Sequence, residues 1–334
     1  MTNKRIISKY RTELMGLSAI MILVVHSVGF VEWPAIINKV FSYGGVGVYS
    51  FVYLSALGLS YSMRMNKSTP PAKFYRKRLS RILTPYFLIY GPWLFIKYIV
   101  FEHDIVVFLY EFSLLRFWFE HKGAWFLAMI IVVYLAFPFY YRWLNNGKCG
   151  LKTIIAVWCI AGCSIVLNWF KPDIFRHLAQ VLNSFLFFEI ACYIVWDEER
   201  EMKRLRVFGS ALLVLYVLRP YRYISVWAIS NYLSGVAWSG LGIVVMIFAA
   251  YILDLMSIGK EHNMLTFCGK HSLELYLWNT ALVNVAQYFE LPLKLKFAWH
   301  SYSSLVVYIG IIVGGFVLSY FTGKLRLKFL GSAK

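Results

Sequence analysis

The sequence predicts an all-α protein that crosses a membrane about ten times and keeps both termini in the cytoplasm. Hydrophobic residues make up 60% of its 334 residues and charged residues only 15%, and the mean hydropathy is +0.62. This composition lies well outside the usual balance of soluble domains. The apolar residues also form runs of about 20, the length that a helix needs to cross a bilayer. The fold class is therefore a polytopic integral membrane protein.

The apolar runs define the spans, and the loops between them are short. We expect spans near residues 14–31, 43–63, 79–100, 123–144, 151–169, 178–196, 204–218, 235–256, 264–288 and 300–322. The first run is too long for a signal peptide and lacks a small-residue cleavage site, so it is expected to be retained. Residues 105–119 are apolar but contain Glu111 and Arg116, which predicts an interfacial helix between the third and fourth spans. No soluble domain is left over, so residues 1–334 form one transmembrane domain.

The net charge of +18 is distributed as in a membrane protein rather than a nucleic-acid-binding protein. Most of the 34 lysines and arginines fall in alternate loops on the side that holds both termini. The positive-inside rule makes that side cytoplasmic. The sequence therefore predicts a multi-pass protein of the inner or plasma membrane, with lipid headgroups and anionic cytosolic ligands as partners and no nucleic acid.

His26 is the one titratable side chain between Met15 and Phe30, in the first span. A rise of about 1.5 Å per residue places it roughly 20 Å from the Arg11 end of the helix. An ionisable group at that depth is costly unless it faces the interior of the bundle, which makes it a candidate for function. The alternative is a histidine that a neighbouring helix satisfies by a hydrogen bond.

Arg78 and Arg81 mark the cytoplasmic end of the third span. They are three residues apart, so they share one face of a helix. Paired guanidinium groups at the start of a helix suit bidentate recognition of phosphate. The alternative is ordinary anchoring of the span, which we expect for the neighbouring Arg76 and Lys77. Arg81 is followed by Ile82 and Leu83, which draws it towards the bundle.

The second span, Gly44 to Ser62, is rich in glycine and serine, which predicts close packing of another helix, the first span being the obvious partner. The histidines and the five cysteines lack the spacing of metal ligands, so no metal site is expected.

Taken together, these features resemble the membrane acyltransferase-3 family, whose members O-acylate sugars and related substrates. The resemblance covers most of the chain. It rests on the opening Glu13-Leu-Met-Gly-Leu-Ser up to His26, the Gly44 to Ser62 span, Arg78-x-x-Arg81-Ile-x-x-Pro-Tyr, Trp125-Phe-Leu with Tyr134 and Pro138, and Cys268-Gly-Lys-His-Ser-Leu-Glu-Leu-Tyr-Leu-Trp278.

The resemblance implies roles for three residues. It makes His26 the catalytic base and associates Arg78 and Arg81 with an acyl-coenzyme A donor, for which acetyl-CoA is the expected compound. Two positions depart from the family pattern. Met15 stands where a basic residue is often found, with Arg11 one helical turn earlier, and Asn279 stands where the late motif often ends in histidine.

Acyl transfer from a thioester to a hydroxyl needs a base, because a free alcohol is a weak nucleophile at neutral pH. A carboxylate beside the imidazole would increase its basicity and fix its tautomer. Glu274, about ten residues into the ninth span, is the candidate for that catalytic support, with an interhelical hydrogen bond as its alternative role. Glu189 in the sixth span is a second candidate. His271, near the cytoplasmic entrance, is expected to help the donor channel.

The acceptor implied by the resemblance is a carbohydrate or glycolipid hydroxyl at the outer face. Trp118, Phe119, His121 and Trp125 flank the fourth span and suit the faces of sugar rings, although an interfacial aromatic belt would look the same. The competing class is a transporter or flippase of a glycan precursor, which would predict repeated halves and matching helix breaks that the sequence does not show. A structural or regulatory descendant of an enzyme is a third possibility.

Overall fold

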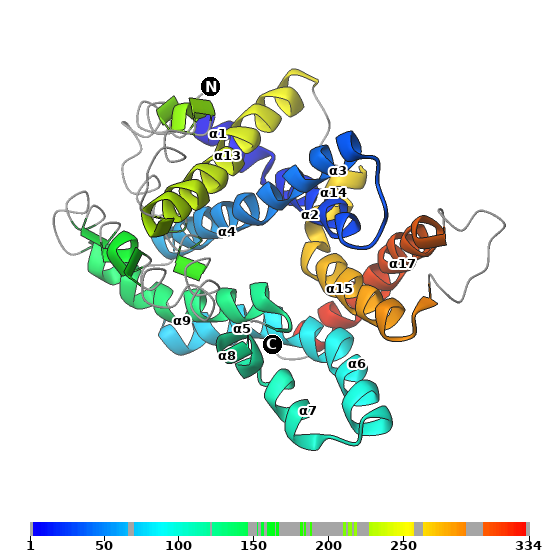
Figure 1. The fold of residues 1–334 in the computed structure, drawn as a ribbon. Helices are drawn as coiled ribbons and strands as arrows, with labels where there is room; N and C mark the ends of the chain where they lie inside the picture. The colour runs from blue at the N-terminus through cyan, green and yellow to red at the C-terminus, as the bar shows by residue number, and fades with distance from the viewer. Residues whose placement is uncertain are drawn as a thin grey trace.

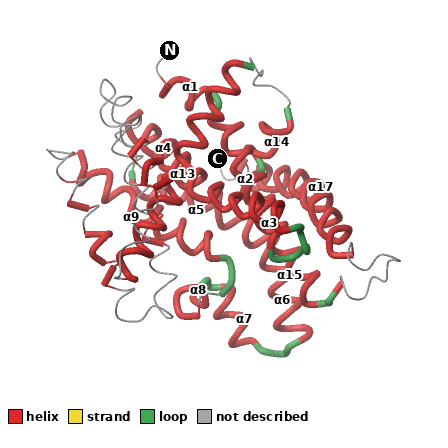
Figure 2. Tube along the Cα trace, turned by 45° about the horizontal axis from the view of Figure 1, so that its top comes forward, coloured by secondary structure: helices red, strands yellow, loops and turns green. Residues whose placement is uncertain are grey.

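The computed structural model describes residues 3–65, 70–120, 122–145, 227–256, 263–291 and 303–331, with isolated helical residues between 152 and 218. Throughout these described residues the secondary structure is helical and no strand occurs (Figure 2). In order, the elements are α1 (Asn3–Lys9), α2 (Arg11–Val28), α3 (Ala35–Ser42), η1 (Tyr43–Gly45), α4 (Val46–Met65), α5 (Pro71–Pro85), η2 (Tyr86–Tyr90), α6 (Gly91–Phe95), η3 (Ile96–Phe101), α7 (Ile105–Phe112), α8 (Leu115–Glu120), α9 (Trp125–Asn145), α13 (Trp227–Leu255), α14 (Met264–Lys270), α15 (Ser272–Tyr288) and α17 (Ser303–Gly331).

Within the described residues, six stretches are long and apolar enough to cross a membrane. Each overlaps one of the predicted spans, and together they make the protein a multi-pass membrane protein. They are Arg11–Val28, Ala35–Met65, Pro71–Phe101, Trp125–Trp143, Tyr232–Leu255 and Ser303–Lys328. The predicted spans 151–169, 178–196 and 204–218 lie outside the described residues except at isolated positions.

The helix from Pro71 to Phe101 contains two π-helical segments, η2 and η3. Each begins shortly after a proline, Pro85 or Pro92, which has no backbone N–H to give to the α-helical ladder. A shift to wider hydrogen bonding is a common way for a helix to absorb this loss.

Two predicted elements differ from the structure. The span expected at 264–288 is divided into α14 and α15, because the backbone leaves helical geometry at His271 (φ −111°, ψ 19°). The helix expected at 105–119 is divided into α7 and α8 by Leu114, which has a φ of 64°. That turn brings Arg116 back to within 2.7 Å of the Glu111 carboxylate, and this ion pair gives the break a physical reason.

The helices surround a central region (Figure 1), and close packing on α2 brings three of them together. Gly47 of α4 faces the Ser18 carbonyl of α2, so a side chain there would collide with backbone. This confirms the predicted packing of the second span against the first. Gly16 of α2 faces Leu265 and Gly269 of α14 faces Thr12 in the same way. Small residues thus allow α14 and α4 to approach α2 from different sides.

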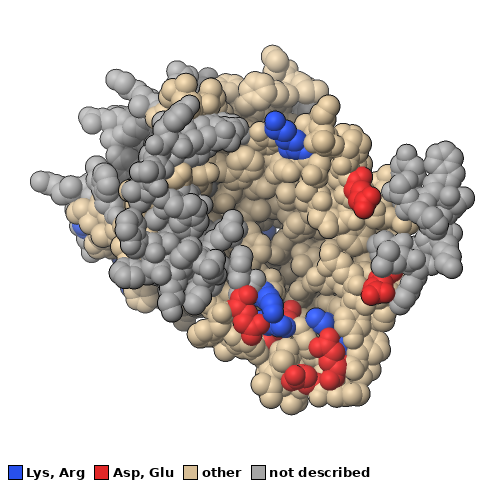
Figure 3. Space-filling model, viewed as in Figure 1, with Lys and Arg blue, Asp and Glu red and all other residues tan. Residues whose placement is uncertain are grey.

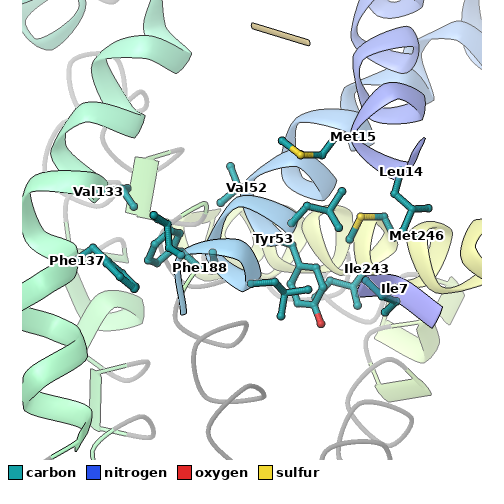
Figure 4. Packing of buried hydrophobic residues seen from close by; sticks show 14 of the residues in the cluster. Ile7, Leu14, Met15, Val52, Tyr53, Val133, Phe137, Phe188, Ile243 and Met246 are labelled. Carbon is teal, nitrogen blue, oxygen red and sulfur yellow. The ribbon is translucent and has the colours of Figure 1, made fainter. Parts of the chain in front are cut away.

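The largest apolar core lies around α4, as Figure 4 shows. Val52 and Tyr53 of α4 are fully buried there. The labelled neighbours come from α9 (Val133, Phe137), from α13 (Ile243, Met246), from α2 (Leu14, Met15) and from α1 (Ile7), together with Phe188. This core fixes α4 between α9 and α13, and so positions the central cavities described next.

Candidate active site

His26 lies near the end of α2 and lines a cavity of about 270 Å³. Most of the wall is aromatic or aliphatic. The Tyr276 ring of α15 lies 6.1 Å from the His26 ring, and Trp125, Phe126 and Trp238 contribute three further rings. The centre of the molecule is hollowed in the space-filling view, between the helices that line this cavity (Figure 3). The imidazole therefore faces an internal space, as the sequence predicted.

The hydrogen-bond partner of His26 is Asn279 of α15, whose Oδ1 lies 2.6 Å from the imidazole Nδ1. The Asn279 Nδ2 group donates to the Tyr308 hydroxyl at 3.4 Å, and that hydroxyl in turn donates to the Leu23 carbonyl. Asn279 and Tyr308 are each only 2% exposed. This buried chain of three hydrogen bonds ties α15 and α17 to α2.

The direction of this chain fixes the tautomer of the neutral imidazole. The Tyr308 hydroxyl gives its one proton to Leu23, so towards Asn279 it can only accept. The amide must then turn its nitrogen to Tyr308 and its oxygen to His26. Because that oxygen only accepts, the hydrogen of the neutral imidazole lies on Nδ1, and Nε2 keeps the lone pair. A base needs this free lone pair.

Glu274 lies elsewhere in the site. It is completely buried and forms an ion pair with Arg326 of α17. It lies among the residues that line a second cavity and not among those that line the His26 cavity. The expected contact between Glu274 and the imidazole is therefore replaced by the contact with Asn279. Its proposed role as catalytic support stays a prediction, and Glu189 lies outside the described residues.

Arg78 and Arg81 both line this second cavity, which has a volume of about 60 Å³. Three more cations join them from other helices, namely Arg11, Lys270 and Arg326. Arg11 lies over Gly58 of α4, where any side chain would collide with it, and its Nε donates to the Leu54 carbonyl at 3.1 Å. Met15, which stands where the family often has a basic residue, lines the same cavity.

The second cavity carries a large excess of positive charge. Five cations meet a single carboxylate, that of Glu274, among the residues that line it. Glu274 contacts Arg326, which leaves Arg78 and Arg81 without a carboxylate partner in the described part of the chain. Such an arrangement attracts an anion, and guanidinium groups bind phosphate in bidentate geometry.

The two cavities adjoin. Phe51, Phe126, Ser272 and Leu273 line both of them. A ligand with an anionic end among the arginines could therefore extend a thin arm between Phe51 and Phe126 to His26. The structure thus places His26 in one cavity and Arg78 and Arg81 in the adjoining one, where Lys270 and Arg326 join them. Asn279 and Tyr308 lie behind His26, in its hydrogen-bond chain.

The other predicted residues are dispersed. Trp125 lines the His26 cavity, whereas Trp118 lines a different cavity beside α5 and α9. Phe119 is 71% exposed, and His121 is outside the described residues. The His271 ring packs between Phe267 and Gly323, and it lines neither of the two central cavities.

Comparison with known families agrees with this geometry. A family model described as an acyltransferase domain matches residues 14–324, which is nearly the whole chain. Comparisons with curated proteins and with solved structures found no match. The matched range contains every residue that lines the two central cavities, apart from Arg11 and Arg326 at its edges.

Proposed function

Since the chain belongs to the acyltransferase-3 family of membrane proteins, we propose that it transfers an acetyl group from acetyl-CoA to a hydroxyl group of a carbohydrate or glycolipid. The observation that carries this proposal is that the arginine-lined cavity and the His26 cavity adjoin, with four lining residues in common. A donor with an anionic head and a reactive end on a long arm matches two adjoining cavities of these kinds. We place the protein in the inner or plasma membrane, where the donor comes from the cytosol.

The phosphates of coenzyme A are the groups that the arginine-lined cavity would bind. Arg78 and Arg81 lie there together with Arg11, so several phosphate oxygens can each accept charge-assisted hydrogen bonds. The cavity is small, so most of the nucleotide would remain outside it at the rim. The pantetheine arm, which is thin and partly apolar, would need a passage past Phe51 and Phe126, which line both cavities.

His26 would act as the general base at the other end of this passage. Its Nε2 takes the proton of the acceptor hydroxyl, and the oxygen then forms a bond to the acetyl carbonyl carbon. The carbon–sulfur bond breaks, and the thiolate of coenzyme A receives the proton from the imidazolium. The proton of the acceptor hydroxyl thus ends on the thiol of coenzyme A, and the imidazole returns to its starting form with hydrogen on Nδ1.

Asn279 serves as a positioning residue in this mechanism, because it holds the hydrogen on Nδ1. We expect Asn279→Leu to lower kcat by about 10- to 100-fold, the value of one or two buried hydrogen bonds. The KM for acetyl-CoA should change little, since Asn279 does not line the arginine-lined cavity. Tyr308→Phe, which leaves Asn279 in place but frees its orientation, should produce a smaller loss in the same direction. Steady-state kinetics of coenzyme A release on variants with wild-type thermal stability would measure both. An unchanged kcat in Asn279→Leu would rule out this role.

The proposal is tested with the purified chain in liposomes. Acetyl-CoA labelled in its acetyl group is added together with a glycan and lipid extract of the producing cells, and labelled product and free thiol are both measured. We expect label to move to the extract with equal release of thiol. A transporter would instead move a glycan precursor across the bilayer without consuming the donor, and that result would replace the proposal.

A further inference from the structure

A third cavity, distinct from the two above, lies between the α6 to α8 region and α15. Its volume is about 540 Å³. We call it the α6–α15 cleft and define it by its lining residues, which are Tyr90, Trp93, Lys97, Tyr98, Glu111, Arg116, Lys122, Gly123, Thr280, Asn284, Gln287 and Tyr288. It shares no lining residue with the His26 cavity, so the function proposed above leaves it unassigned.

The walls of the α6–α15 cleft combine flat rings with amide groups. Trp93 and Tyr98 are buried in its wall, while Tyr288 is 38% exposed at its edge. Asn284 donates to the Tyr90 hydroxyl at 2.9 Å, which leaves its amide oxygen available as an acceptor. Rings that can stack on an apolar face, beside amides that bond hydroxyl groups, form a surface suited to a sugar ring.

Among the described residues, every charge of the cleft except that of Lys97 has an oppositely charged partner, and the Lys97 ammonium lies over the rings of Tyr98 and Tyr288. Arg116 contacts Glu111 at 2.7 Å and Glu120 at 3.2 Å, and Lys122 lies 3.5 Å from the same Glu120. The hydrogen bond from Arg116 lowers the pKa of the Glu120 carboxyl, so this carboxylate stays charged at neutral pH. Lys97 donates to the Tyr98 hydroxyl at 2.9 Å and, within the described chain, contacts no carboxylate. One ammonium group is therefore left for a ligand.

The cleft lies one helical turn from the catalytic cavity. Thr280 lines the cleft, and its hydroxyl donates to the backbone carbonyl of Tyr276. The side chain of Tyr276 lines the His26 cavity. Similarly, Gly123 lines the cleft and Trp125 lines the His26 cavity. One turn rises about 5.4 Å, comparable with the length of one pyranose unit. In Figure 3 charged side chains gather beside the central hollow, in the region where Figure 1 shows α6 to α8.

From these observations we propose that the α6–α15 cleft binds an acidic sugar unit of the acceptor, adjacent to the unit whose hydroxyl is acetylated at His26. The inference rests on the proposed function. Lys97 recognises the oxyanion, which is a carboxylate or a phosphate, while Trp93 and Asn284 hold the ring. The acceptor is then at least two sugar units long, because the two cavities are separate.

Binding to the purified full-length protein tests this assignment in the absence of donor. The probes are a glucuronic acid–glucose disaccharide, the same disaccharide with a phosphate ester in place of the carboxylate, and the neutral glucose–glucose disaccharide. Titration calorimetry should show at least one acidic probe bound about tenfold more tightly than the neutral one, the value of one hydrogen bond to a charged group. The acidic probe that binds more tightly identifies the oxyanion.

Three variants make the test specific. Lys97→Met should abolish the preference for the acidic probe, and Lys97→Arg should retain it. Lys39→Met removes an exposed lysine of α3, outside the cleft, and should also retain the preference. Unchanged binding of coenzyme A to Lys97→Met would show that the variant is folded.

The assignment would be overturned if acidic and neutral probes bound equally, or if the preference for the acidic probe survived Lys97→Met. It would also be overturned if phosphatidylglycerol, but not free acidic sugar, competed with the bound probe. Failure of the proposed function would appear separately, as absence of acetyl-CoA turnover in a protein that still discriminates between these sugars.

Discussion

Replacing His26 by alanine is expected to lower the kcat for acetyl transfer by about a thousandfold, within the range that general bases contribute. The side chain is the one group in the described walls of its cavity that can take a proton from an alcohol at neutral pH. The KM for acetyl-CoA should remain close to that of the wild type, because the phosphates would bind in the adjoining cavity. Measurement of thiol release with increasing acetyl-CoA separates these two quantities.

A matched control is His271→Ala. His271 directly precedes α15 and follows Lys270 of the arginine-lined cavity, but its ring packs between Phe267 and Gly323 and lines neither central cavity. It should retain most of the activity if it folds. Added imidazole should partly restore His26→Ala, because the truncation leaves a space beside Asn279. Wild-type turnover in His26→Ala would refute the assignment of the base.

The second large effect is expected at the arginines. Changing Arg81 to methionine should raise the KM for acetyl-CoA by about 10- to 100-fold, the value of one or two charge-assisted hydrogen bonds. The kcat should be nearly unchanged, since Arg81 does not line the His26 cavity. Arg78→Met should behave in the same way. Steady-state kinetics and direct binding of coenzyme A would both show the change.

The donor itself offers the sharper comparison. S-acetylpantetheine retains the arm and the thioester but lacks the phosphates and the nucleotide. Wild type should use it poorly, and Arg81→Met should use it as well as wild type does. Lys77→Met removes a lysine of the same helix that does not line the cavity, and so controls for a general loss of positive charge. If Arg81→Met weakened both donors equally, the guanidinium would be shown to act on something other than the phosphates.

Much of this fold follows from the sequence, because a bilayer imposes a minimum length on apolar helices. Where the structure describes the chain, six predicted spans are helical and long enough to cross. The break at His271 could not be predicted, since residues 264–288 read as one apolar run. It depends on where Gly269 meets the backbone of α2.

The candidate site was predictable to the extent that a charge in an apolar helix stands out. This identified His26, Arg78 and Arg81, and the structure places them on the walls of two adjoining cavities. The partner of His26 could not be found in this way. Glu274 and Asn279 are five residues apart on α15, so they point about 140° away from each other. Only packing decides which of them faces α2, and the hydrogen bond to Asn279 spans 253 residues of sequence. Arg326 lies in a basic stretch near the C-terminus, and nothing in its sequence position indicates its contact with Glu274.

The central claim is that one donor molecule occupies both adjoining cavities at once. An electron cryomicroscopy structure of the protein with a thioether analogue of acetyl-CoA, which has no cleavable thioester, tests this directly. We predict phosphate density against Arg78 and Arg81, the arm between Phe51 and Phe126, and the acetyl carbonyl carbon within reach of the Nε2 atom of His26. An analogue bound with its phosphates away from these arginines, or with its acetyl group outside the His26 cavity, would contradict the account.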